Sequence, residues 1–599
     1  MTDRLYEARY GRLEDLALLT GKGRYVDDIH LPGMLEVAFV RSPHGHALFH
    51  SINAAAALAL PGVHAVYTHV DVAQTLTSDH IPPDQVVDSF PTTTWPYILP
   101  KDEVCFVGEA VAVVVADTRY IAEDAATLVE VDYESLPVVS NCRKATDPES
   151  PTVHLHAADN IVSRFTTEYG DVEPAFVEAA HIFGFSLKQH RGGAHSIEGR
   201  GVVANYDADS HHLTIWTSTQ SPHKSRDAAV ELFDMDESRV RVIVPDVGGG
   251  FGGKNTVYPE EILTNMASHL LARPVKWIED RREHFLASIQ ERDQEWDVEV
   301  AVDTEARVQG VRGTIYHDQG AYTLLGLHVP HNSAIAVPGP YHIPNYRIEV
   351  LVAETNKVGT IPVRGAGYPE GNFTIERVLD RIARELGMDR AEVRRRNLIP
   401  GDAIPYQMPM KTREGTPMIY ESGDFLRCHE MALEAAGYTD FAQRQKEALT
   451  EGRHIGIGVA NMVKVTGRGP FESATVRVGR SGRVVIYTSA MAMGQGTKTT
   501  LAQICAEQLA IAPDQITVVT VDTASSPIGI GAYGSRNTVN AGNSVHLAAG
   551  EVREKAIRVA AHVFGVDEQD IEITDGLARV KDDPANSLTF KEIAKALGA

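Results

Sequence analysis

Residues 246–255 read DVGGGFGGKN and lie between an apolar stretch typical of a strand, VRVIVP (240–245), and a helix predicted to begin at Pro259. Counted from Gly248, the stretch fits G-x-x-x-x-G-K, the phosphate loop of nucleotide triphosphatases, but Asn255 stands where that loop needs Ser or Thr to hold Mg²⁺. Glycines here allow positive φ angles and let backbone N–H groups approach a ligand closely. The stretch therefore predicts an α/β arrangement with a strand–loop–helix junction. It leaves three alternatives open: a nucleotide, another ligand, or a tight turn that serves packing alone.

Two further loops share this character. VGTIPVRGAGYPEG (358–371) places Arg364 among small residues directly before a helix, and MAMGQGTKTT (491–500) places Gln495 between two glycines at another helix start. Helix starts offer unpaired N–H groups and the positive end of the helix dipole, so both loops suit an anionic group. Three such loops without a nucleotide motif favour a large polyanionic cofactor that is held from several sides.

Composition narrows the class of protein. The 599 residues carry a formal charge of −24 and are 43% hydrophobic and 23% charged. An acidic chain of this kind argues against a nucleic-acid partner or an anionic membrane surface, because phosphate binding depends on Lys and Arg. No apolar run approaches the ~20 residues that cross a bilayer. The charged N-terminus lacks the apolar core of a signal peptide, so we expect a soluble cytoplasmic protein with no membrane segment.

The cysteines give no metal or disulfide motif. Cys105, Cys142, Cys428 and Cys505 are scattered, with no C-x-x-C pair. This spacing indicates neither a disulfide framework nor a zinc or iron–sulfur site, and favours core packing or lone thiols. Any redox metal must be held in another way or by another chain.

The order of predicted elements indicates a mixed α/β (α+β) multidomain protein. A first unit, a linker, an alternating strand and helix unit, a connector with four prolines and a second α/β unit are predicted at 1–140, 141–158, 159–398, 399–424 and 425–599. In the middle unit, apolar residues recur at helical spacing: Ile375, Val378, Leu379, Ile382 and Leu386. The last predicted helix, 589–597, has no strand after it. We therefore expect another polypeptide to complete the final domain.

Six stretches carry a family resemblance, which extends over nearly the whole chain. They are RLEDLALLTGKGRYVDDIHLPGMLEVAFVRSPHGHA, FVGEAVAVVVADT with AEDAATLVEVDYESLP, STQSPH, PDVGGGFGGK, RGAGYPEGNFTIERVLDRIARELGMD and MGQGTKTTLAQICAEQLA. The sequence resembles the molybdenum-cofactor-binding large subunit of the xanthine dehydrogenase, aldehyde oxidase and carbon monoxide dehydrogenase group of molybdenum hydroxylases. The resemblance implies an N-terminal aldehyde oxidase "hammerhead" domain followed by two molybdopterin-binding domains, the second incomplete at its C-terminus.

The resemblance also implies the site residues. Gln220 matches a glutamine whose amide faces a molybdenum oxo group, and Phe251 and Arg364 match residues beside the metal and the substrate. These three are the predicted catalytic residues. The predicted cofactor contacts are Gln220, Gly249, Gly250, Phe251, Gly252, Arg364, Gly365, Ala366, Gly494, Gln495, Gly496, Ser535 and Arg536. No protein metal ligand is implied, because the pterin dithiolene holds the molybdenum. Arg536 has the right side chain for a forked hydrogen bond to phosphate.

The reaction that the resemblance implies is hydroxylation of an electron-poor carbon, in an aldehyde or an N-heteroaromatic ring, with oxygen from water. The implied cofactor is molybdopterin, in its cytosine dinucleotide form. The implied partners are a small subunit with [2Fe–2S] clusters, an FAD subunit and a second large-subunit fragment that carries the general-base glutamate, assembled as a dimer of heteromers. A truncated chain is the alternative to a split subunit, and a catalytically incompetent cofactor carrier or assembly scaffold is the alternative function.

Three departures from the family narrow the range of expected substrates. The loop VRGAG (363–367) lacks the cysteine of carbon monoxide dehydrogenases, so a copper–molybdenum site and oxidation of carbon monoxide are not expected. Asn255 replaces an acidic substrate-binding residue of xanthine oxidases, and Ala366 replaces an aromatic one. Xanthine is therefore not the expected substrate either.

Overall fold

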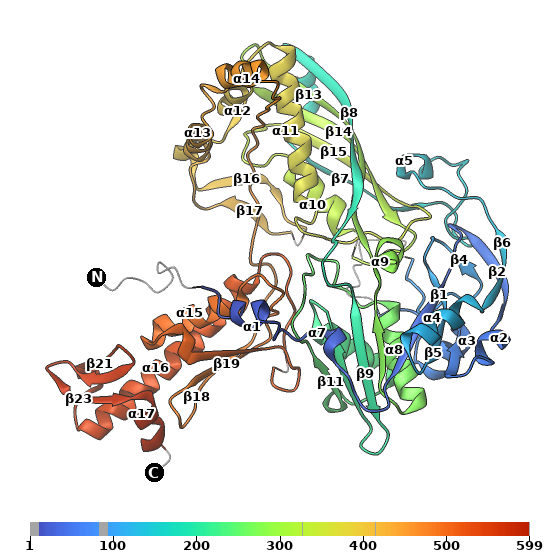
Figure 1. Cartoon of the computed structure of the whole chain (residues 1–599). Coiled ribbons are helices and arrows are strands. Elements are labelled where there is room, and N and C mark those ends of the chain that lie inside the picture. The colour runs from blue at the N-terminus through green and yellow to red at the C-terminus, as the bar shows by residue number, and fades with distance from the viewer. Residues whose placement is uncertain (1–10, 83–93, 326, 414, 527, 598–599) are drawn as a thin grey trace.

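The computed structural model describes residues 11–82, 94–325, 327–413, 415–526 and 528–597 (Figure 1). Two large sheets with their helices lie against each other, and the C-terminal helices and strands form a separate lobe beside them (Figure 1). No helix in these ranges is both long enough and apolar enough to span a bilayer.

The first large sheet joins segments that the sequence assigned to different units. Its seven strands, in spatial order, are β11 (Val240–Ile243), β10 (His212–Thr217), β9 (Gly201–Asp207), β12 (Val275–Ile278), β1 (Leu35–Arg41), β5 (Ala110–Ala116) and β3 (Val63–Tyr67). β1 pairs in parallel with β12, with Leu35 opposite Val275. The sheet therefore continues across the predicted boundary between 1–140 and 159–398. Local sequence patterns do not show such long-range pairing.

Helices and a small sheet surround this first sheet. The helices are α4 (Arg119–Thr127), α7 (Pro222–Phe233), α8 (Pro259–Leu271) and α9 (Arg281–Ala287), and the small sheet consists of β4 (Glu103–Val104), β2 (Ala47–Asn53) and β6 (Glu130–Ser135). The helix predicted at Pro259 is confirmed. A turn at 105–109 separates β4 from β5.

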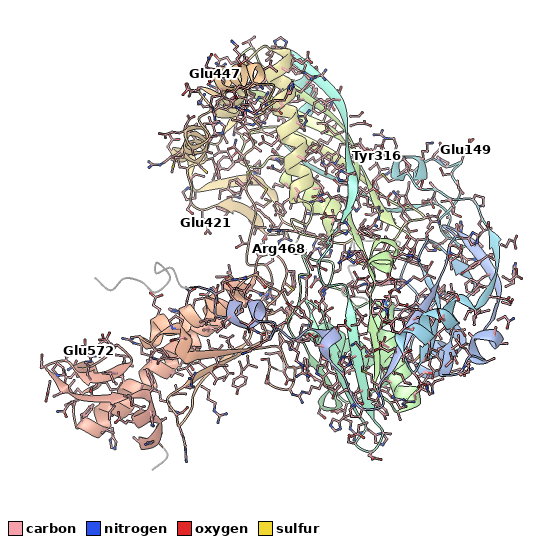
Figure 2. The ribbon with its side chains drawn as sticks, in the orientation of Figure 1. Glu149, Tyr316, Glu421, Glu447, Arg468 and Glu572 are labelled. Atoms are coloured by element: carbon pink, nitrogen blue, oxygen red, sulfur yellow. The ribbon has the colours of Figure 1, made fainter. Side chains whose placement is uncertain are left out.

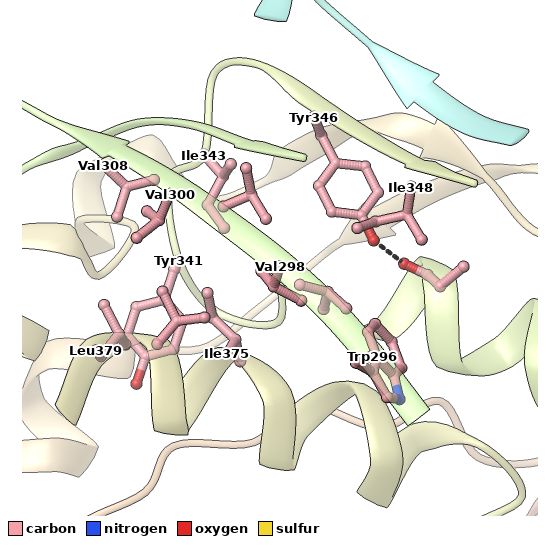
Figure 3. Packing of buried hydrophobic residues seen from close by; sticks show 14 of the residues in the cluster. Trp296, Val298, Val300, Val308, Tyr341, Ile343, Tyr346, Ile348, Ile375 and Leu379 are labelled. Carbon is pink, nitrogen blue, oxygen red and sulfur yellow. Dashed lines mark hydrogen bonds between the residues drawn. The ribbon is translucent and has the colours of Figure 1, made fainter. Parts of the chain in front are cut away.

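The second large sheet holds the main hydrophobic core. It consists of β7 (Ile161–Tyr169), β15 (Tyr346–Glu354), β14 (Val308–Gly320), β13 (Gln290–Val302) and β8 (His181–Gly193), with α10 (His328–Ala336) and α11 (Tyr368–Glu385) against one face. Figure 3 shows Ile375 and Leu379 of α11 beneath Val298 and Val300 of β13. Of the predicted apolar stripe, Ile375, Val378, Leu379 and Ile382 are fully buried and Leu386 packs at its margin. This core positions the start of α11, where the VRGAG loop ends.

The predicted linker and connector both contain regular structure. Residues 141–158 include a short helix, α5 (Cys142–Ala145), and residues 399–424 include a hairpin of β16 (Tyr406–Lys411) and β17 (Pro417–Tyr420). The prolines of 399–424 hid this hairpin in the sequence. The next helices, α13 (Phe425–Ala435) and α14 (Phe441–Thr450), follow the hairpin; Phe425 packs against the second-sheet core, and Glu430 pairs with Arg395 of α12 (Arg390–Asn397).

The C-terminal lobe is an α/β unit with its own core. It contains β18 (Ala474–Val478), β19 (Val484–Thr488), β20 (Ile516–Thr520), α15 (Thr497–Leu509), α16 (Gly542–Phe564), a hairpin sheet of β21 (Ile571–Thr574), β22 (Leu577–Val580) and β23 (Asp583–Thr589), and α17 (Phe590–Ala596). Gly482, with φ of 84°, lies in the turn between β18 and β19 and lets them pair as an antiparallel hairpin. Figure 2 labels Glu572 at the outer end of this lobe and Arg468 where the chain enters it.

Candidate functional site

Gln220 joins the GGGFGG loop to the loop formed by residues 529–536 of the C-terminal lobe. It follows β10 and is only 2% exposed. Its Oε1 accepts hydrogen bonds from the N–H of Gly252 (2.7 Å) and of Lys254 (3.3 Å), and its Nε2 donates to the carbonyl oxygen of Ala532 (2.6 Å). Ala532 returns a bond from its own N–H to the Gln220 carbonyl oxygen. One side chain therefore fixes the GGGFGG loop to a loop of the C-terminal lobe, and a second N–H of its amide remains for a ligand.

The GGGFGG loop needs glycine at several positions. Gly249, Phe251 and Gly252 have φ values of 97°, 55° and 112°. A Cβ on Gly250 would lie 2.6 Å from Oε1 of Gln220, and one on Gly252 would lie 2.4 Å from the carbonyl oxygen of Pro362. The glycines therefore allow close approach of this loop both to Gln220 and to the VRGAG loop.

The VRGAG loop lies directly against the GGGFGG loop. The Arg364 N–H donates to the Phe251 carbonyl oxygen at 2.7 Å. Gly365, Ala366 and Gly367 all have positive φ, and a Cβ on Gly367 would meet the Val329 carbonyl oxygen of α10 at 2.4 Å. Asn332 of α10 donates to the Ala366 carbonyl oxygen. α10 thus holds this loop in place, a contact that no sequence pattern predicted.

Phe251 and Arg364 lie together on the exposed side of these loops. Phe251 is 43% exposed, Arg364 is also exposed, and the guanidinium carbon lies 5.9 Å from the centre of the ring. A cation at this distance is attracted by the ring face. The pair presents an aromatic surface and a positive charge to a molecule that approaches the loops.

The lysine and asparagine of GGKN do not form a nucleotide triphosphate loop. Lys254 is 4% exposed, and its ammonium group pairs with Glu198 at 3.0 Å. Burial lowers the pKa of Lys254. Asn255 faces inward, where its Oδ1 accepts from the Ser221 hydroxyl at 2.6 Å. Because α8 begins only at Pro259, Lys254 does not lie at the start of a helix as a Walker lysine does.

The MGQGT loop lies on the other side of the GGGFGG loop. Lys498 of α15 approaches Asp246 at 3.5 Å, and Met491 packs with Val244 and Val247. Gly494 and Gln495 are exposed, and a Cβ on Gly494 would meet nothing within 4 Å. α15 starts after Gly496 without a side-chain cap. This loop is therefore open, and it ends in the uncapped helix start that the sequence predicted.

The N-terminal segment that begins the RLEDLALLTGKG motif contacts the MGQGT loop. Arg12 donates to the Gly494 carbonyl oxygen at 2.7 Å, and the Leu13 N–H donates to the Thr499 hydroxyl at 2.8 Å. The helix that follows, α1 (Asp15–Leu19), lies beside α15 in Figure 1. Both residues open the motif RLEDLALLTGKG, but the sequence pattern did not predict their contact with the MGQGT loop.

Arg536 has a different role from the predicted contact with phosphate. Its side chain is 0% exposed and forms an ion pair with the buried Glu472. Its remaining N–H groups donate to the carbonyl oxygens of Arg468, Phe471 and Gly531. The guanidinium group therefore holds the 529–536 loop instead of facing a ligand. Ser535 is exposed on the same loop, with φ of 54°.

These features fit a molybdenum cofactor of the pterin type. Its phosphate suits the uncapped start of α15 and the open backbone at Gly494, because helix starts bind anions through unpaired N–H groups. Its metal end suits the buried amide of Gln220, and the close glycine loops leave no Cβ to obstruct its approach. The structure thus brings together Gln220, the three predicted glycine loops and the 529–536 loop around one site, with only the side chain of Arg536 turned away from it.

Models of known protein families match most of the chain. Residues 20–137 match the family model for the aldehyde oxidase and xanthine dehydrogenase a/b hammerhead domain. Residues 153–398 and 431–598 match two models for molybdopterin cofactor-binding domains. Every residue of the predicted site lies within the two cofactor-binding matches.

Individual relatives align over almost the whole chain. The nicotine 6-hydroxylase large subunit of Paenarthrobacter nicotinovorans is 35% identical over 98% of this chain and 73% of its own length. The carbon monoxide dehydrogenase large chain of Afipia carboxidovorans is 34% identical over 98% of this chain and 75% of its own. The crystal structure of quinoline 2-oxidoreductase from Pseudomonas putida 86 superimposes with a TM-score of 0.90 at 37% identity and covers 98% of this chain and 75% of that one.

Proposed function

We propose that this chain, which belongs to the xanthine dehydrogenase and aldehyde oxidase family of molybdopterin-binding large subunits, hydroxylates an electron-poor carbon of an N-heteroaromatic ring. The chain is a subunit of a molybdenum-dependent oxidoreductase, as its relatives are. Two of those relatives are named for N-heteroaromatic compounds, nicotine and quinoline. Their names support this substrate class over aldehydes.

The observation that carries the proposal is the pairing of Phe251 with Arg364 beside Gln220. Offset stacking on an aromatic side chain contributes about 0.5–1.5 kcal/mol beyond area burial, so the exposed Phe251 ring suits a flat heterocycle. Arg364 supplies a cation for a ring nitrogen or for charge that develops during the reaction. Gln220, held on both sides by backbone, orients an oxygen at the metal end through its second amide N–H.

The overall reaction is ring C–H + H₂O → ring C–OH + 2 H⁺ + 2 e⁻. The bound cofactor supplies the two-electron redox chemistry. The chain's own residues bind and orient: the glycine loops carry the cofactor, Phe251 aligns the ring and Arg364 stabilises charge.

We further propose the assembly that this family implies. It comprises the cytosine dinucleotide form of molybdopterin, together with a small [2Fe–2S] subunit and an FAD subunit that remove the electrons. The complex pairs as a dimer of such heteromers. The names of the relatives, among them "large subunit" and "complex subunit gamma", support a multi-subunit enzyme.

The first test uses protein purified from its native source. We expect about one molybdenum per chain, CMP after acid hydrolysis, and co-purifying chains with iron–sulfur and flavin cofactors. Quinoline, a pyridine, xanthine and benzaldehyde are then compared as substrates in H₂¹⁸O. Labelled oxygen in the hydroxylated heterocycle, with a much lower rate on xanthine and benzaldehyde, is the expected result. Preferential oxidation of benzaldehyde contradicts the substrate class, and a complex without molybdenum contradicts the function as a whole.

A further inference from the structure

A second cluster of metal-binding side chains lies far along the chain from the loops described above. His46 precedes β2, Glu103 lies in β4, Cys105 follows β4, and His154 belongs to the segment before β7. The ligand atoms of His46, Glu103 and Cys105 all lie within 4.8 Å of one another. Nδ1 of His154 lies 3.3 Å from Sγ of Cys105.

Both histidine rings are already oriented as metal ligands are. Nδ1 of His46 bonds the Pro137 carbonyl oxygen at 2.8 Å, and Nε2 of His154 bonds the Ala321 carbonyl oxygen at 2.6 Å. A carbonyl oxygen can only accept, so these nitrogens carry the protons, and in the neutral ring the other nitrogen has a free lone pair. That nitrogen points at Glu103 in His46 and at Cys105 in His154. In the metal-free contact of 2.8 Å, Nε2 of His46 donates a proton to Glu103, and a metal ion bound between the two atoms would displace that proton. Metal-bound histidines are characteristically fixed by a hydrogen bond of the far ring nitrogen.

Burial and charge also suit a divalent cation. Cys105 is 1% exposed and His46 is 3% exposed, and the side chains of His154 and Glu103 are 12% and 14% exposed. One thiolate, one carboxylate and two neutral imidazoles sum to −2, which a divalent cation neutralises. A neutral buried complex avoids the large desolvation penalty of an isolated charge.

We infer that His46, Glu103, Cys105 and His154 form a four-ligand site for Zn²⁺. One sulfur, two imidazole nitrogens and a carboxylate oxygen are all zinc ligands, and four-coordination without an open position is typical of a structural zinc site. At Zn–S of about 2.3 Å and Zn–N or Zn–O of about 2.0 Å, tetrahedral geometry separates the ligand atoms by roughly 3.3–3.5 Å. The His46–Glu103 contact of 2.8 Å and the Cys105–His154 contact of 3.3 Å lie within about 0.5 Å of these separations. His154 contacts Cys105 but lies outside the group of three whose ligand atoms are all within 4.8 Å of one another, so its ring must move toward His46 and Glu103 to become the fourth ligand.

The site would fasten two parts of the fold. His46, Glu103 and Cys105 belong to the first unit, whereas His154 lies in the segment that leads into β7. The Leu155 N–H already donates to Glu103, and Asn356 donates to the Cys105 carbonyl oxygen. The ligands come from separate stretches of chain, so no C-x-x-C spacing marks the site in the sequence. A bound cation would lock these stretches together without a role in the redox reaction.

The test uses the full chain in its purified complex. After dialysis against a chelator, the protein is titrated with Co²⁺, whose bond to a thiolate absorbs in the near ultraviolet. We expect about one tight equivalent with thiolate absorption, displaced by Zn²⁺. We also expect X-ray absorption at the zinc edge to give one sulfur and three nitrogen or oxygen neighbours. This second measurement needs no variant and therefore does not depend on whether a mutant folds.

Two variants and a control locate the site. Cys105→Ser and His154→Gln should each lose the thiolate band or the tight equivalent, whereas Cys428→Ser, at the exposed cysteine of α13, should keep both. Zinc should raise the thermal unfolding temperature of the wild type and of Cys428→Ser, but not of the other two. Absence of tight binding, zinc without a sulfur neighbour, or a band that persists in Cys105→Ser overturns the inference.

Discussion

Gln220 and Gln495 are both amide side chains beside a glycine loop of the same site, but their surroundings differ. Gln220 is 2% exposed and bonds to residues 32 and 312 positions away in the chain. Gln495 is exposed, and within the part of the chain that the structure describes its side chain bonds to Met491 and Met493 of its own loop. The first therefore holds distant segments together, whereas the second leaves the backbone around it open. We call the part of the site around Gln220 the closed side and the part around Gln495 the open side. The closed side fixes the positions of the loops, and the open side presents free N–H groups to a ligand.

The largest loss of stability is expected from a change at Glu472, which anchors the closed side. Glu472 accepts hydrogen bonds from the N–H groups of Ile530 and Gly531 and pairs with the fully buried Arg536. Glu472→Gln leaves that guanidinium group without its counter-charge, and removing one partner of a buried pair costs about 3–5 kcal/mol. We expect a loss of this size in the stability of the C-terminal lobe, measured by hydrogen exchange at Gly531 and Ala532.

A double variant distinguishes buried charge from a general packing defect. Glu472→Gln combined with Arg536→Met removes both charges and should recover much of the stability that Glu472→Gln alone loses. Replacing both members of a buried ion pair by uncharged side chains is often neutral or even stabilising. If the double variant is less stable than Glu472→Gln alone, Arg536 contributes mainly through its bonds to backbone carbonyl oxygens, and the proposed anchor is wrong.

The glycines of the two sides should respond differently to the same added methyl group. Gly252→Ala places a Cβ 2.4 Å from the Pro362 carbonyl oxygen at φ of 112°, whereas Gly494→Ala meets nothing within 4 Å at φ of 90°. Unfavourable φ alone costs about 1–3 kcal/mol, and Gly252→Ala adds a backbone clash. We expect Gly252→Ala to lose most of its molybdenum and Gly494→Ala to retain more than half, measured by elemental analysis. Similar losses in both variants would contradict the distinction between closed and open sides.

The two glutamines can be compared directly by truncation. Gln220→Ala leaves the N–H groups of Gly252 and Lys254 and the Ala532 carbonyl oxygen unpaired, and an unsatisfied buried group costs about 1–3 kcal/mol. We expect a loss of about 3 kcal/mol and at least a hundredfold lower kcat. Gln495→Ala exposes its partners to water and should change stability by under about 0.5 kcal/mol. Denaturant unfolding and steady-state kinetics on both variants measure the difference, and equal effects would contradict it.

The same contrast explains which features of the fold and the site could be predicted from the sequence. The helix starts at Pro259 and α15, the apolar stripe of α11 and the glycine loops are local patterns, and all are present in the structure. The parallel pairing of β1 with β12 depends on contacts between residues 240 positions apart, which no local window contains. The β16–β17 hairpin is local, but the prolines of 399–424 hid it. Arg536 had the right chemistry for phosphate, but Glu472, 64 residues earlier, binds it instead. Burial and partner choice are tertiary properties, so the composition of the site was predictable and the direction of its side chains was not.

A buried carboxyl group on the closed side gives the last and smallest prediction. Glu370 lies in the first turn of α11, directly after the VRGAG loop, is 3% exposed, and has no hydrogen-bond partner for Oε2 among the described residues. Burial raises its pKa from 4.5 to about 7. The folded protein therefore keeps a proton that the unfolded chain releases above pH 4.5. The stabilisation from this proton is fully present below pH 4.5 and is lost as pH rises through 7.

Glu370→Gln keeps the neutral shape at every pH and should remove this dependence. We expect the unfolding free energy of the wild type to fall by up to about 3 kcal/mol more than that of the variant between pH 4.5 and 7.5. Glu385→Gln, at the exposed end of the same helix, is the matched control and should follow the wild type. Denaturant titrations at several pH values measure the difference. If wild type and Glu370→Gln lose stability in parallel, the carboxyl group is reached by water, and the start of α11 belongs with the open side of the site.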